Sequence, residues 1–96
     1  MITTVVRADF KELFGNLLCL SHGDRCTDPD GSPVRLAEGQ LVIAFEEESV
    51  ESRREYLVAS GSVERAPEEL ACPGSRWVLR LDAEGVRRVT ELPIGT

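Results

Sequence analysis

Apolar and polar residues alternate along several short stretches of this chain, which is the pattern of strands that bury one face. The clearest case lies in residues 76–91, where Trp77, Leu79 and Leu81 alternate with charged residues. Residues 82–85, Asp-Ala-Glu-Gly, then have the composition of a type I turn whose last residue can adopt positive φ. The stretch therefore predicts a β-hairpin, with Trp77 as the anchor of the core. Leu79, Leu81, Ile43 and Phe45 are expected to pack near it.

This hairpin would place several arginines on its polar face. A glycine bulge at the turn sets Arg80 directly opposite Arg88, with Arg76 on the same side. Because like charges in that position destabilise a strand pair, some anion is expected nearby. It could be internal, with Glu64 of the preceding strand as the partner, or it could be a carboxylate or phosphate of a bound molecule. Arg76, Arg80 and Arg88 are therefore the candidate binding residues.

Other stretches also have the patterns of strands. Residues 40–46 are apolar on both faces, which is typical of a central strand. Residues 55–65 alternate regularly, with Leu57, Ala59, Gly61 and Val63 on one face. Gly61 in their middle indicates a bulge or a tight bend of the sheet. The charged residues 47–54 predict an exposed connection between these two strands. Shorter strands are predicted over residues 2–8, 17–21, 25–27 and 34–36.

One short helix is predicted near the N-terminus. Asp9 is a candidate N-cap, and Glu12 follows at the spacing of a capping box. Phe10, Leu13 and Phe14 would share one apolar face of a helix from about residue 10 to residue 14.

These elements predict a mainly β fold, and the length of 96 residues predicts one domain over 1–96. About six strands with one short N-terminal helix indicate a small antiparallel barrel or rolled sheet of the SH3-like or OB-like kind. A two-layer β-sandwich is the alternative.

Composition narrows the range of functions. The formal net charge of −6 argues against duplex nucleic acid as a ligand, which requires a basic face. The longest apolar run, residues 41–45, is far too short to cross a membrane. Residues 1–7 lack the pattern of a secretory signal, so a cytoplasmic location is expected.

The cysteines raise a second possibility. Cys19-x-x-His22-x-x-x-Cys26 could supply zinc ligands, with Cys72 much later in the chain. However, Cys19 lies within an apolar run, and buried free cysteines are common in cores. The odd number of cysteines also argues against a disulfide framework. The favoured prediction is therefore that these residues bind no metal and that the protein needs no cofactor.

Two functional hypotheses follow. The first is a non-catalytic interaction module that binds a protein partner, or associates with itself, through a barrel face or a sheet edge. The first strand or residues 34–36 could provide such an edge. The second is a small zinc protein or enzyme that uses Cys19, His22 and Cys26. Ser21 and His22 are neighbours on a predicted strand and would point to opposite faces, which argues against a nucleophile–base pair.

Overall fold

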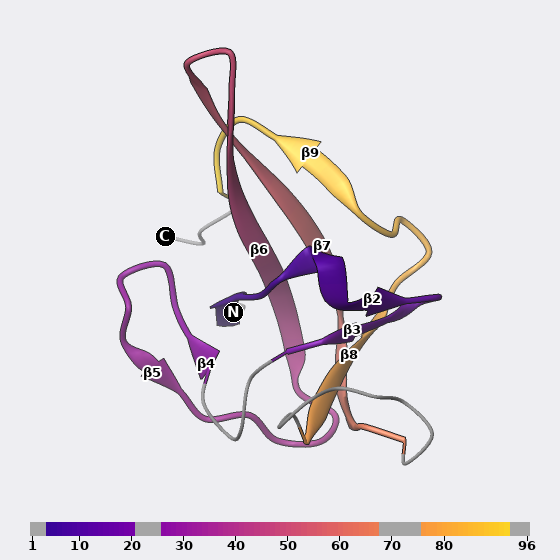
Figure 1. Ribbon diagram of the computed structural model, residues 1–96. Helices are drawn as coiled ribbons and strands as arrows, with labels where there is room; N and C mark the ends of the chain where they lie inside the picture. The colour runs from indigo at the N-terminus through magenta and orange to yellow at the C-terminus, as the bar shows by residue number, and fades with distance from the viewer. Residues whose placement is uncertain (1–3, 21–25, 68–75, 93–96) are drawn as a thin grey trace.

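A computed structural model describes residues 4–20, 26–67 and 76–92 of the chain (Figure 1). The fold is mainly β, as predicted. The elements are β1 (Thr4–Arg7), a 3₁₀ turn η1 (Phe10–Glu12), β2 (Leu13–Phe14), β3 (Leu17–Cys19), β4 (Cys26–Thr27), β5 (Pro33–Val34), β6 (Leu41–Val50), β7 (Arg53–Arg65), β8 (Trp77–Leu81) and β9 (Arg87–Val89).

Seven of the strands form one sheet in the order β1-β6-β7-β8-β3-β2, with β9 also paired to β7. The short strands β4 and β5 form a separate two-stranded sheet. All the pairs are antiparallel except β1 with β6, which run parallel from Thr4 opposite Val42 to Arg7 opposite Phe45. The parallel pair departs from the expected antiparallel arrangement.

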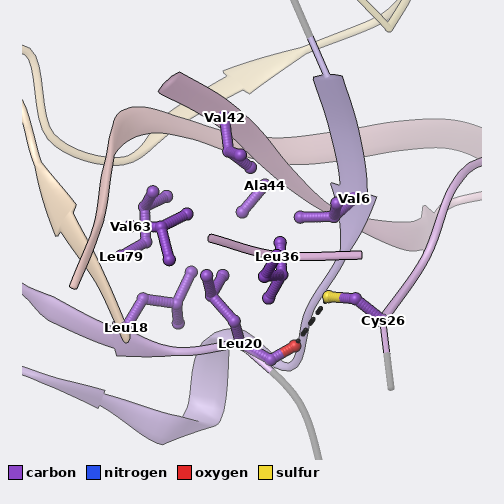
Figure 2. Close-up of a cluster of buried hydrophobic side chains, with 9 residues drawn as sticks. All are labelled: Val6, Leu18, Leu20, Cys26, Leu36, Val42, Ala44, Val63 and Leu79. Carbon is purple, nitrogen blue, oxygen red and sulfur yellow. Dashed lines mark hydrogen bonds between the residues drawn. The ribbon is translucent and has the colours of Figure 1, made fainter. Parts of the chain in front are cut away.

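The main sheet is curved but open. Val6 on β1 and Leu18 on β3 lie near opposite ends of the strand order, yet both belong to one buried cluster (Figure 2). A flat sheet would hold them apart with three strands between them, so the sheet must bend around this cluster. Within the described residues the strands at its two ends, β1 and β2, do not pair with each other. Of the predicted barrel or rolled sheet, the barrel is therefore wrong, because the sheet does not close.

The predicted N-terminal helix is also wrong. Asp9 does cap a turn, since its Oδ1 accepts a hydrogen bond of 3.0 Å from the Lys11 amide. The helical conformation nevertheless ends after the three residues of η1, because Leu13 pairs with Leu18 across a tight hairpin. Gly15 allows that hairpin with a φ of 63°. Strand pairing here overrides a weak local preference for helix.

The predicted hairpin over residues 76–91 does not form. Leu81 of β8 lies opposite Gly61, and Arg87 of β9 lies opposite Val58, so both strands run antiparallel to β7 and follow each other along it. The turn between them has the expected chemistry, with the Gly85 amide 3.1 Å from the Asp82 carbonyl. The turn interrupts a strand instead of reversing it. β7 is 13 residues long, so β8 before the turn and β9 after it can both pair with β7.

The predicted loop over residues 47–54 is instead part of a long hairpin. β6 continues to Val50, which pairs with Arg53 at the start of β7. The two residues between them, Glu51 and Ser52, have φ values of 49° and 68°. Positive φ at both central positions defines a type I′ turn. The hairpin projects beyond the end of β1, and residues 46–55 are called the arm below (Figure 1).

The inner side of the curved sheet holds the larger core. Trp77 and Leu81 border it as predicted, and Leu79 between them is fully buried. Figure 2 shows its nine buried residues: Val6, Leu18, Leu20, Cys26, Leu36, Val42, Ala44, Val63 and Leu79.

The outer side of the sheet holds a smaller core, made by Val5, Phe45 and Val58 with Ile43 at its border. The sequence predicted that Ile43 and Phe45 would pack near Trp77, and that is wrong. In β6 the two faces alternate, so Ile43 and Phe45 point away from the side that Trp77 borders. Trp77 itself is only half-buried and is not the centre of the core.

Candidate functional site

A cleft of about 660 Å³ lies where the end of β7 and the start of β8 approach the segment that follows β5. Its volume is within the range of pockets that hold small molecules or side chains of a partner. The described residues that line it are Pro33, Val34, Arg35, Leu36, Arg65, Arg76 and Trp77.

Strand pairing and core packing position these side chains. Arg65 and Trp77 are opposite each other in the last pair of β7 and β8. The Ala66 amide donates a 2.9 Å hydrogen bond to the Arg76 carbonyl and extends that pairing by one step. On the other side, Leu36 is buried in the inner core and holds the exposed Arg35 beside the cleft.

The cleft is basic within an acidic protein. Three guanidinium groups line it, although the chain as a whole carries a formal charge of −6. Arg35 and Arg65 make no ion pair with any residue that the structure describes. Half-buried Trp77 supplies an aromatic surface beside these two charges. This arrangement can bind an anion that carries an apolar group.

Arg80, a predicted binding residue, is paired within the protein. Its Nη2 lies 3.1 Å from Glu64 Oε1, and its Nε bonds Glu64 Oε2. The hydrogen bonds from the guanidinium lower the pKa of the Glu64 carboxyl, and the carboxylate raises the pKa of Arg80 in turn. The internal partner expected from the sequence is therefore the one observed.

Arg88, another predicted binding residue, lies at the base of the arm. Its Nη1 is 3.0 Å from both Glu48 Oε2 and Glu55 Oε2. Those two carboxylates are directly opposite each other on β6 and β7, where they would repel without a cation. Hydrogen bonding to Glu55 and attraction to Glu48 raise the pKa of Arg88.

The structure does not bring Arg76, Arg80 and Arg88 together. Arg80 pairs opposite Ser62, whereas Arg88 pairs opposite Leu57 further along the same strand. This separation follows from β8 and β9 lying in series. Of the three, Arg76 alone lines the cleft among the described residues.

Sequence reasoning missed Arg35 and Arg65 as site residues. Arg65 lies opposite Trp77, and this register would have indicated Arg65 as a site residue. The register, however, depends on the pairing of β7 with β8, which no local sequence pattern reveals. Arg35 reaches the cleft from a segment 30 residues earlier and has no sequence signal of its own.

The predicted metal ligands are only partly described. Cys26 is a free buried thiol whose Sγ donates to the Leu20 carbonyl at 3.2 Å (Figure 2). Burial raises its pKa from 9.0 to about 11, so the free thiol is protonated at neutral pH. Cys19 is disulfide-bonded, which the sequence did not predict.

His22 lies outside the described residues, so the zinc hypothesis stays a prediction that metal analysis of the purified protein can test. In the part of the chain that the structure describes, no group of three or more His, Cys, Asp and Glu side chains could hold a metal ion.

A smaller hollow of about 370 Å³ lies beside Cys26 and contains Glu46 from the triad of glutamates in β6. Glu46 Oε2 accepts a 2.8 Å hydrogen bond from the Phe10 amide. This carboxylate therefore holds the 3₁₀ turn against the sheet, which is a structural role.

Comparison of the chain with protein-family models, curated proteins and solved structures finds no match. Among the described residues, no helix is long and apolar enough to cross a membrane.

Proposed function

We propose that the protein is a non-catalytic interaction module, and that its cleft takes up an acidic segment of a protein partner. The observation that carries this proposal is the pair of guanidinium groups of Arg35 and Arg65 beside Trp77. They line a concave site and have no carboxylate partner among the described residues.

The chemistry of the lining supports a peptide ligand. A guanidinium group binds a carboxylate through two parallel hydrogen bonds, which fixes both position and orientation. Val34 and Trp77 add apolar surface to the same cleft, where an aliphatic or aromatic side chain of the partner can be buried. Aromatic residues and arginine are the residues that most often dominate binding energy at protein interfaces.

The lining also supports binding over catalysis. Its described members are three arginines with Pro, Val, Leu and Trp side chains. None of these types is a usual nucleophile or general base at neutral pH. The cleft can therefore hold and orient a ligand, and its residues suit recognition better than bond cleavage.

Calorimetric titration with a short peptide of glutamates around one central leucine tests the proposal. We expect the parent to bind, with an affinity that weakens as salt increases because the attraction is electrostatic. Arg35→Gln/Arg65→Gln should weaken binding at least about tenfold. The matched control, Arg53→Gln/Arg87→Gln, removes the same charge away from the cleft and should bind like the parent. Equal weakening in both variants would contradict a specific site.

A further inference from the structure

The elements that line the cleft are the end of β7, the start of β8 and the segment after β5. Figure 1 shows them at the opposite end of the molecule from the arm. The protein is elongated, with extents of 39 × 28 × 26 Å. The arm extends five residue pairs beyond the pairing of β1 with β6, or roughly 16 Å at the rise of a β-strand. Its tip therefore cannot reach the cleft of its own chain.

The arm is opposite to the cleft in charge. Residues 46–55 carry five glutamates and two arginines, a formal charge of −3. Glu47 is paired with Arg54 at 3.2 Å, and Glu48 and Glu55 share Arg88. Glu51 at the tip makes no ion pair with any described residue. Its carboxylate is thus available to a cation of another molecule.

The tip also offers an apolar group next to that carboxylate. Val50 precedes Glu51 and is 40% exposed, which is high for a valine in a paired strand. The type I′ turn itself favours Asn-Gly, and two residues with side chains in the left-handed region carry a conformational cost. The sequence of the tip is therefore not the one that would best stabilise the turn.

From these observations we infer that the acidic segment bound by the cleft is the arm tip of a second copy of this chain. This inference rests on the proposed function of the cleft. Glu51 of one copy would approach Arg35 and Arg65 of the next, and Val50 would contact Trp77. The charges are complementary, and each surface places an apolar side chain beside ionic groups: exposed Val50 on the arm and half-buried Trp77 in the cleft.

Such an interface joins two different surfaces of the same chain, so it is head-to-tail. An association of this kind does not close unless the rotation between copies permits a ring. Every open assembly therefore keeps one free cleft and one free arm, and its mass should increase steadily with concentration. Because the contact is largely ionic, the association should weaken as salt increases.

Complementation between two variants tests this inference. Glu51→Asn/Ser52→Gly removes the carboxylate of the tip while giving the turn its preferred residues, and Arg35→Gln/Arg65→Gln removes the charges of the cleft. In sedimentation experiments the parent should form assemblies that grow with concentration, and each variant alone should remain monomeric. In a mixture, the intact arm of the cleft variant should bind the intact cleft of the tip variant. This one-to-one dimer should grow no further, because it has no other intact arm or cleft. The matched control, Glu38→Gln, removes one exposed carboxylate elsewhere and should behave like the parent.

Several results would overturn the inference: a parent that stays monomeric at millimolar concentration, a tip variant that still associates, or a mixture that stays monomeric. The tip variant should melt at or above the temperature of the parent, so misfolding would not explain its failure to associate. Binding of the acidic peptide by a parent that does not associate would overturn this inference alone. Failure of that peptide to bind at the cleft would overturn the proposed function as well.

Discussion

Gly61 of β7 lies so close to Arg80 of β8 that a side chain at position 61 would collide with the Arg80 carbonyl oxygen and carbonyl carbon. The atoms that a Cβ at position 61 would meet belong to the backbone of Arg80 and Leu81, so no change of side-chain rotamer can relieve the collision. This contact lies at the end of β8, next to the pair formed by Gly61 and Leu81, before the chain leaves the sheet at Asp82. The sequence indicated a bulge or a tight bend at Gly61; the structure shows there a close approach of two backbones, which only glycine allows.

Replacing Gly61 by Ala should therefore destabilise the protein by at least about 2 kcal/mol, since the added methyl group overpacks a site that cannot expand. Chemical denaturation of the variant and the parent measures the difference. Ser62→Ala is the matched control on the neighbouring, half-exposed position and should change stability little. A Gly61→Ala protein as stable as this control would show that β7 and β8 are not so close.

The Arg80–Glu64 pair leads to a prediction about protonation. The guanidinium lowers the pKa of Glu64, so a carboxyl titration followed by NMR should show a midpoint below the usual value for glutamate. The stabilisation exists above the pKa of the unfolded state and disappears as pH falls through the lowered pKa. Because both side chains are exposed, we expect only a small effect on stability. In Arg80→Gln the midpoint should rise, and an unchanged midpoint would contradict the pair.

The buried thiol of Cys26 predicts a loss of stability in alkali. Its pKa is raised from 9.0 to about 11, so above pH 9 the unfolded chain loses this proton before the folded protein does. The free energy of unfolding should fall by roughly 2–3 kcal/mol as pH rises through that range, at 1.36 kcal/mol per unit of pKa difference. Cys26→Ser removes the titrating group and should show a smaller decline over the same range. Parallel pH profiles for the two proteins would contradict a buried, neutral thiol.

The turn at the arm tip predicts a stabilising substitution. Asn and Gly tolerate positive φ better than Glu51 and Ser52 do, so Glu51→Asn/Ser52→Gly should stabilise the fold by about 1 kcal/mol. Thermal unfolding of the dilute protein measures this effect apart from any association. A clear decrease in melting temperature would indicate that the tip does not have the described backbone conformation.

The sequence predicted local features of the fold better than the pairing of strands. Alternation in residues 55–65 correctly placed Leu57, Ala59 and Val63 on one face of a long strand. The turn at residues 82–85 was also correct, with Gly85 at a φ of 64°. Whether such a turn reverses a strand or only interrupts it depends on the partner strand, which is distant in sequence.

The arm was missed for a different reason. Its strands have little apolar alternation, since ion pairs such as Glu47 with Arg54 replace apolar contacts across the ribbon. A run of charged residues without an Asn-Gly turn has the composition of a loop. The site residues differ in the same way. Arg76 was predicted because it adjoins the clearest strand, whereas the place of Arg35 in the cleft depends on tertiary packing alone.

¹H–¹⁵N NMR mapping of the dilute protein with the glutamate-rich peptide would show whether the cleft beside Trp77 binds an acidic segment. Trp77 is the only tryptophan, so its indole N–H gives one unambiguous signal at the site. We expect the peptide to shift this signal together with the side-chain signals of Arg35 and Arg65, while a peptide with Gln in place of Glu has no effect. Shifts confined to other parts of the chain, or equal shifts with both peptides, would contradict the account.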